Sequence, residues 1–244
     1  MNARYINYLF LFYILFSGLP YFSAAQTAAD ANPKDSILKV EKIADFALAG
    51  DGSAIQWNKA QWINLPQTEG KATMYTTQFK TVYSDSGIYC LFKCEDNKIT
   101  ATLTEDFADL YNEDVVEIFL HTDETAPIYF EYELSPLNYE LPIIVPNFNH
   151  TFFGWRPWHY EGNRKTRHAV HINKHGNAVT SWTAELFIPF LLLKPMPNAI
   201  PQKGTRWRAN FYRIDYDNKT SEWSWQPTRK TFHEYEKFGT IEFQ

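Results

Sequence analysis

The sequence predicts an all-β protein whose single domain is an antiparallel β-sandwich of the jelly-roll or immunoglobulin-like kind. Segments of alternating apolar and polar residues recur along the chain, and turn sequences such as Asp85-Ser86-Gly87 and His175-Gly176-Asn177 separate them. Strands are predicted at residues 73–83, 87–94, 114–121, 128–134, 167–173, 178–188, 205–214 and 239–243. Only residues 30–49 and 187–193 leave room for short helical turns, and many short strands with little helix are typical of a sandwich.

The N-terminus is typical of a secretory signal. Arg4 is the only charge before a short apolar run at residues 8–16, and small residues precede Gln26. The run is shorter than the roughly 20 residues that a membrane-spanning helix needs. We therefore expect a signal peptide at residues 1–25, with an uncleaved anchor as the alternative.

The predicted cleavage defines the rest of the chain. Residues 26–36 are Ala, Asn, Asp and Lys around a proline, which predicts a flexible lead. Residues 37–244 then form one domain of ordinary length, with no membrane span in the mature chain. A signal of this kind predicts an exported protein that is periplasmic, on the cell surface or secreted.

Charge and ring content limit the class of partner. The formal net charge is −5, and it becomes −6 once Arg4 is removed with the signal. An acidic chain without a basic block has nothing to neutralise phosphates, which argues against nucleic acid and anionic membrane surfaces. The 8 Trp and 15 Tyr residues are enough to form both a core and a stacking surface for a ligand.

The two cysteines of the chain, Cys90 and Cys94, lie on one face of a predicted strand. Four strand residues span roughly 13 Å, whereas bridged Cα atoms lie within roughly 7 Å of each other. We therefore expect two buried free thiols rather than a disulfide. A zinc site would need further ligands of suitable spacing.

Side-chain alternation separates core from surface on three predicted strands, since successive residues point to opposite faces. The predicted core face comprises Trp182, Ala184, Leu186, Ile188, Trp207, Ala209, Phe211, Phe130, Tyr132 and Leu134. On the predicted strands 128–134 and 205–214, the residues that point to the opposite face are Tyr129, Glu131, Glu133, Arg208, Asn210 and Tyr212. This pattern predicts a polar sheet face with rings, which is either a binding site or a solvated surface.

Glu117 stands between Val115 and Phe119 on one face of the predicted strand 114–121. A carboxylate among apolar neighbours is costly to desolvate. We therefore expect Glu117 either to pair with a donor such as an arginine or to line a cavity.

Several segments together resemble a known family. They are Asn112-Glu113-Asp114-Val115-Val116-Glu117-Ile118-Phe119, Trp182-Thr183-Ala184-Glu185-Leu186-Phe187-Ile188-Pro189-Phe190 and Trp223-Ser224-Trp225-Gln226-Pro227-Thr228, with Asp51-Gly52 before them and Phe238-Gly239 after them. In this order and spacing they are similar to the family-nine carbohydrate-binding module and its looser relatives in bacterial envelopes. The resemblance covers almost the whole mature chain.

The resemblance implies a β-sandwich that holds a sugar between two aromatic rings. Tyr111 would be the first ring, and Trp223 or Trp225 the second. The ligand-binding set that we expect is Tyr111, Glu117, Glu133, Arg208, Asn210, Tyr212, Trp223 and Trp225. The chain departs from the family pattern in having Tyr111 for Trp, Glu133 for Arg and Tyr212 for Gln.

The resemblance also implies a non-catalytic role in polysaccharide breakdown or uptake, alongside glycoside hydrolases. We predict a glycan or small saccharide as ligand and no cofactor, although relatives can carry a structural calcium ion. Trp155 and Trp158, in an irregular segment after Pro146, are candidates to extend the site.

Two other classes remain open. A glycoside hydrolase could use a carboxylate pair such as Glu117 and Glu133, with Glu131 and Glu185 as further candidates, but the chain has no hydrolase motif. A metal or haem site could use His168, His171 and His175, with Met74 or Met196 as a haem ligand. Surface histidines are the simpler interpretation.

Overall fold

The computed structural model describes residues 37–149, 151–217 and 219–244, so the predicted signal and lead lie outside the described residues. Its strands are β1 (Ile37–Lys42), β2 (Ile63–Leu65), β3 (Gln67–Glu69), β4 (Thr77–Tyr83), β5 (Gly87–Glu95), β6 (Val115–His121), β7 (Ile128–Leu134), β8 (Glu140–Phe148), β9 (Thr151–Phe152), β10 (Arg156–Pro157), β11 (Arg167–His175), β12 (Ala178–Pro189), β13 (Arg206–Asp215), β14 (Ser221–Ser224) and β15 (Gly239–Phe243). Helical structure is limited to α1 (Phe190–Leu193) and the 3-10 turns η2 (Ile55–Lys59), η3 (Leu110–Asn112), η4 (Gly162–Arg164) and η5 (Tyr235–Lys237). Within these residues no helix is long and apolar enough to cross a membrane.

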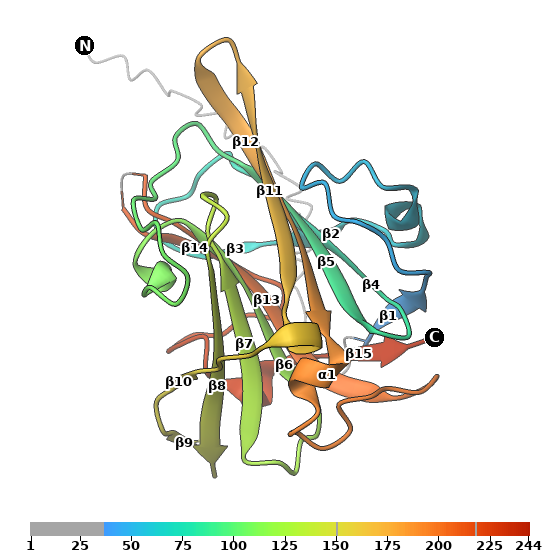
Figure 1. The fold of residues 1–244 in the computed structure, drawn as a ribbon. Coiled ribbons are helices and arrows are strands. Elements are labelled where there is room, and N and C mark those ends of the chain that lie inside the picture. Colours follow the sequence, from blue (N-terminus) through green and yellow to red (C-terminus); the bar gives the residue numbers. More distant parts are fainter. Residues whose placement is uncertain (1–36, 150, 218) are drawn as a thin grey trace, which may run out of the picture. The chain divides into compact units, whose positions relative to one another are not determined.

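The strands form a β-sandwich, which confirms the predicted fold class (Figure 1). The first sheet has the order β10-β8-β7-β6-β13-β15, and the second has the order β4-β5-β12-β11. β1 joins the two, because residues 37–40 pair with β15 and residues 41–42 pair with β4. Both of these pairings are parallel, so the sandwich is not purely antiparallel as predicted.

The main core lies between the two sheets. Phe79 of β4 stacks on Phe211 of β13 with ring centroids 4.0 Å apart, which places the inner faces of the sheets in direct contact. The predicted core residues of β7, β12 and β13 all belong to this buried cluster. The alternation of side chains therefore separated inner from outer positions correctly on these strands.

The outer face of the second sheet is covered by the segment that contains η2. Glu185 of β12 is fully buried there, and its carboxylate accepts hydrogen bonds from the backbone N–H groups of Ala49, Gly50 and Gly52 at 2.7–3.0 Å. The indole Nε1 of Trp57 donates a fourth bond at 2.8 Å. This carboxylate thus anchors the covering segment and is not available as a catalytic group.

Some predicted elements differ from the structure. The segment 30–49 left room for helical turns, and its described part, residues 37–49, contains strand β1 and no helix, whereas α1 confirms the expectation at 187–193. The irregular segment after Pro146 contains β9, β10 and η4. Strands β8 and β14 were not predicted, because strand formation depends on the pairing partner as well as on local propensity.

Prediction on the thiols. Cys90 and Cys94 are fully buried and unpaired, and burial raises the pKa of each thiol to about 12. The folded protein, never exposed to reductant, should therefore be unreactive to a thiol reagent, and two equivalents should react after denaturation. A denatured protein without reactive thiols would contradict the assignment of both residues to the inner face.

Prediction on the Glu185 anchor. Glu185→Gln replaces one acceptor oxygen by a donor group and removes the charge that four buried donors share. We expect a loss of about 3 kcal/mol or more in the free energy of unfolding, measured by urea denaturation. Glu41→Gln, at an exposed position of β1, is the control and should change stability by less than about 0.5 kcal/mol. Equal stability of the two variants would refute the anchoring role.

Candidate functional site

The outer face of the first sheet carries rows of polar side chains across adjacent strands. Glu117 of β6 lies directly opposite Tyr212 of β13 on one side and Glu133 of β7 on the other. In the next row, Phe119 lies between Asn210 and Glu131. Because cross-strand partners project from the same face, three carboxylates from two neighbouring strands are brought together.

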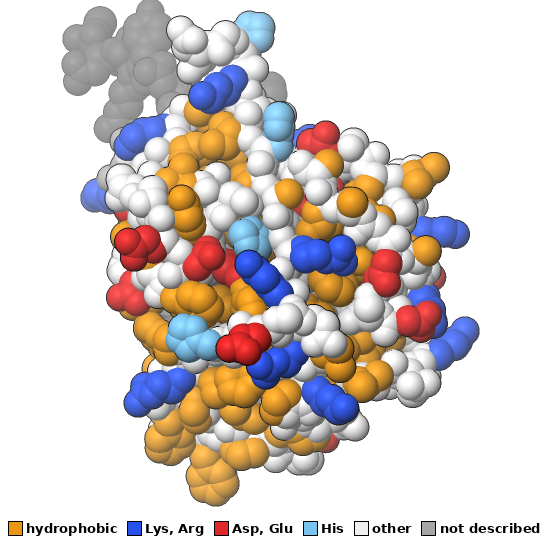
Figure 2. Space-filling model, in the orientation of Figure 1, with side chains coloured by type: hydrophobic (Ala, Val, Ile, Leu, Met, Phe, Trp, Pro, Cys, Tyr) orange, Lys and Arg blue, Asp and Glu red, His pale blue; other side chains and the backbone are white. Residues whose placement is uncertain are grey.

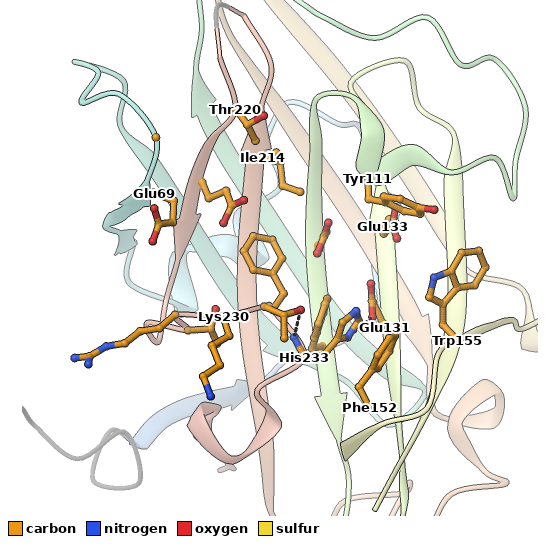
Figure 3. A pocket seen from close by; sticks show the side chains of 18 of the residues that line it. Glu69, Tyr111, Glu131, Glu133, Phe152, Trp155, Ile214, Thr220, Lys230 and His233 are labelled. Atoms are coloured by element: carbon orange, nitrogen blue, oxygen red, sulfur yellow. Dashed lines mark hydrogen bonds and ion pairs between the residues drawn. The ribbon is translucent and has the colours of Figure 1, made fainter. Parts of the chain in front are cut away.

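A cavity of about 850 Å³ lies over these rows. The loops that surround it come from distant parts of the chain and contribute Tyr111, Phe152, Trp155 and residues 228–233. Figure 3 shows Tyr111 and Trp155 beside Glu131 and Glu133 on one side of the cavity, and Glu69 on the other. The volume falls in the range of small-molecule sites.

The three carboxylates are almost completely buried, with exposed fractions of 2% for Glu117, 4% for Glu131 and 1% for Glu133. Within the described residues neither Oε2 of Glu131 nor Oε2 of Glu133 has a hydrogen-bond partner. Native proteins seldom leave such atoms unpaired. These two oxygens are therefore the atoms that a ligand in the cavity would satisfy.

Burial governs the protonation of this cluster. It raises the pKa of Glu117 to about 8, with the charge of Glu222 as a second cause. Burial, followed by the charge of Glu117, raises the pKa values of Glu131 and Glu133 well above the usual range. Like charges on neighbouring strands in a water-poor site disfavour ionisation of all three groups.

His233 closes the lower edge of the cavity in Figure 3. Burial lowers the pKa of His233 to about 4, so the ring is neutral. Its Nδ1 forms a hydrogen bond with the hydroxyl of Tyr129 at 2.6 Å and lies 3.7 Å from Glu131 Oε2, which is too long for a hydrogen bond. The ring of Phe152 stacks on the imidazole at 4.1 Å. Glu131 thus gains no counter-charge from this histidine.

The aromatic side of the cavity is formed by Tyr111 and Trp155. Their rings meet edge to face with centroids 6.1 Å apart, and both are half-buried. Tyr111 was predicted as a clamp ring, and Trp155 as a candidate extension of the site. Trp158 instead packs against the main core and donates its indole N–H to the carbonyl of Leu192.

Three other predicted ligand residues share this sheet face but do not line the cavity, because neighbouring groups occupy their polar atoms. The hydroxyl of Tyr212 donates to the carbonyl of Phe232, whose ring stacks on Tyr212 at 4.0 Å. The amide of Asn210 donates to Tyr212 Oη and to the carbonyl of Gln226. The guanidinium of Arg208 donates to Thr240 Oγ1 and to the carbonyl of Phe238.

The second ring of the expected clamp is not at the cavity. Trp223 pairs with Arg213, which pairs with Val116 on the inner face of the first sheet, so the Trp223 ring is buried between the sheets. Trp225 packs edge-on against Phe79 and Phe211 of the main core. The expectation that one of these rings meets Tyr111 over a common cavity is thus corrected, and the reason is the register of β14 on β13.

Several residues of the lining had no ligand role assigned from the sequence. Phe152, Phe232 and His233 lie outside the predicted strands, and Glu222 belongs to β14, which was not predicted. The end of the molecule at β8 and β9 is also rich in exposed rings, since Phe148 and Phe153 are 62% and 61% exposed. Hydrophobic side chains gather at this end in Figure 2. The aromatic richness of residues 152–158 was the available signal.

One group of carboxylates in the described residues has spacing that suits a metal ion, namely Asp96, Asp215 and Asp217. Arg213 Nη2 already bonds Asp96 at 3.0 Å and Asp215 at 2.6 Å. Asp217 accepts bonds from the hydroxyls of Thr100 and Tyr75. Calcium takes six to eight oxygen ligands, and Arg213 already bonds two of these three carboxylates.

The predicted histidine ligands do not assemble. His168 Nδ1 lies 2.9 Å from Asn138 Oδ1, whereas His171 and His175 are exposed along β11. Met74 is exposed and Met196 is buried in the main core. The described residues thus offer no common site for the three histidines.

Comparison with known proteins places the chain among carbohydrate-binding folds. The family profile described as "Carbohydrate family 9 binding domain-like" matches residues 49–244. No curated protein matches the sequence. A candidate carbohydrate-binding protein from Bacteroides uniformis has a similar solved structure, with a TM-score of 0.72, 18% identity, and coverage of 86% of this chain and 99% of that chain.

Two further structures are of a family 9 carbohydrate-binding module from Caldicellulosiruptor kristjanssonii. One is in complex with glucose and has a TM-score of 0.60 at 16% identity, covering 86% of this chain and 96% of that chain. The other is in complex with cellotriose and has the same TM-score and identity, with coverage of 85% and 94%. At these identities the likeness shows a common fold.

Prediction on pH and stability. The pKa of Glu117 is about 8 in the folded protein and about 4.5 when exposed, so the folded state holds more protons between these values. The free energy of unfolding should therefore fall as pH rises from about 4.5 to 8, by at most about 1.4 kcal/mol per pH unit for each such carboxyl group. Glu117→Gln should flatten this slope, and Glu41→Gln should leave it unchanged. A slope that Glu117→Gln does not alter would contradict the proton on Glu117.

Proposed function

Because this chain belongs to the carbohydrate family 9 binding domain-like family, we propose that it binds a saccharide in the cavity on the outer face of its first sheet. One observation carries the assignment to this cavity. The rings of Tyr111 and Trp155 lie beside carboxylates with unpaired buried oxygens, all within one cavity.

The chemistry of a pyranose suits such a site. Its C–H groups form an apolar face that packs on an aromatic ring, and its rim of hydroxyls needs hydrogen-bond partners. Tyr111 and Trp155 supply the apolar surface. The oxygens of Glu131 and Glu133 accept bonds from hydroxyls when ionised and can also donate when protonated.

The arrangement of the carboxylates favours binding over hydrolysis. A glycosidase needs one carboxyl group that stays protonated and a second that is ionised, so their environments must move the two pKa values apart. Burial here raises the pKa values of Glu117, Glu131 and Glu133 together. No carboxylate of this cluster is therefore distinguished as the ionised partner at neutral pH.

The cellular role extends this proposal. The apolar run before Gln26 supports export to the periplasm, the cell surface or the medium. There the protein would hold a glycan for polysaccharide breakdown or uptake, with separate glycoside hydrolases performing the cleavage. N-terminal sequencing of the exported protein tests this location, because the mature chain should begin at Gln26.

Prediction on the binding rings. A glycan array followed by calorimetry on the best ligand should show binding by the parent protein. Tyr111→Ala and Trp155→Ala should each weaken that binding by about 2 kcal/mol, roughly thirtyfold, because each removes stacking surface from the centre of the site. Trp62→Ala, which removes an exposed ring outside the cavity, is the control and should bind like the parent.

The melting temperature of each variant separates loss of binding from loss of folding. If Tyr111→Ala and Trp155→Ala are both well folded and each binds as tightly as the parent, this cavity is excluded as the saccharide site. Sustained release of reducing sugar that is lost in Glu117→Gln would instead show that the protein is a hydrolase.

A further inference from the structure

We propose that the saccharide of this cavity is an amino sugar, whose free ammonium group pairs with the carboxylates of Glu131 and Glu133. The inference rests on the proposed function and specifies the class of ligand. It is carried by the unpaired buried oxygens of these two residues and by the balance of charge around the cavity.

The groups that face the cavity are predominantly acidic. Strand β6 contributes Glu117, β7 contributes Glu131 and Glu133, β14 contributes Glu222, and β3 contributes Glu69. The cationic side chains of the lining are those of Arg229 and Lys230, which are both exposed. Among the described residues, no Lys or Arg forms an ion pair with a carboxylate of β6 or β7 in this cavity.

Position separates these two cations from the carboxylates. Figure 3 shows Lys230 on the side of the cavity opposite Glu131 and Glu133. The backbone N–H groups of Arg229 and Lys230 donate to Glu234 Oε2, which holds their segment at the rim. Burial lowers the pKa of His233, which lies 3.7 Å from Glu131 Oε2, to about 4, so this ring is neutral. A counter-charge for Glu131 and Glu133 in their ionised form would therefore have to come from a ligand.

The geometry suits an organic cation better than a metal ion. Among the described residues the acidic group with spacing that suits a metal ion is the one around Arg213, and the carboxylates of β6 and β7 do not form such a group. An ammonium group on a sugar ring has three donors that diverge, so it suits a lining that holds both Glu131 and Glu133. Tyr111 and Trp155 lie beside these oxygens and offer ring faces to a cationic sugar.

Charge pairing of this kind has a measurable proton signature. Burial holds protons on Glu131 and Glu133 in the empty cavity, and a cation favours the ionised carboxylate. Binding of an ammonium group should therefore release protons to the buffer. Binding of a neutral sugar should release none, because hydroxyl groups can accept from the protonated acids.

The test compares three trisaccharides with the same backbone on the mature protein at near-neutral pH. They are the glucosamine trisaccharide with free amines, its N-acetylated form and cellotriose. Calorimetry in two buffers of different ionisation enthalpy gives both the affinity and the number of protons released. We expect the free amine to bind at least about tenfold more tightly than either neutral form, with net proton release.

The variants Glu131→Gln and Glu133→Gln should each reduce this preference to about twofold or less and lower the number of protons released, whereas Glu41→Gln should preserve both. If cellotriose and the glucosamine trisaccharide bind with equal affinity, or if both variants still release as many protons on binding as the parent, the ligand is not selected by its ammonium group. Either result would leave the proposed saccharide binding intact. Absence of binding to every glycan on an array that includes amino sugars would overturn the proposed function itself. A simple diamine that binds as tightly as the amino trisaccharide would show that the site recognises amines without a sugar.

Discussion

The cost of burying carboxylates on the outer face of the first sheet is the constraint on which this structure depends. Glu117, Glu131 and Glu133 lose almost all contact with water, and the described residues provide no arginine or lysine partner for them. An isolated ionised carboxylate in such surroundings is costly, so burial favours the protonated form of all three groups. The stability of the fold and the chemistry of the cavity are therefore coupled.

The fold treats its other buried carboxylates differently. Glu185 on the second sheet is fully satisfied by four donors, and Asp96 and Asp215 share the guanidinium of Arg213. Glu185 thereby anchors the segment that covers the second sheet. Glu131 and Glu133 differ from these paired carboxylates, because each keeps a buried oxygen without a hydrogen-bond partner among the described residues.

Family membership and local chemistry answer different questions about this protein. The family 9 profile and the solved structures establish a carbohydrate-binding fold. The cavity, however, pairs Tyr111 with Trp155 rather than with a ring from the closing segment 223–225, and it places Glu133 among other acids. Fold alone does not determine a ligand, because specificity is decided by the groups that line the site.

The recurrence of short strands between turns was enough to predict the sandwich, and alternation predicted the inner core faces and placed Glu131 and Glu133 on the opposite face of their strand, because strand parity is a local property. That Glu117 shares this outer face depends on how β6 pairs with β7. Parity could not say that Trp223 faces inward, since that depends on how β14 aligns with β13. The positions of Trp155 and His233 likewise depend on where distant loops return over the sheet. Only the tertiary structure decides these, because the contacts that enclose a cavity join residues that are far apart in sequence.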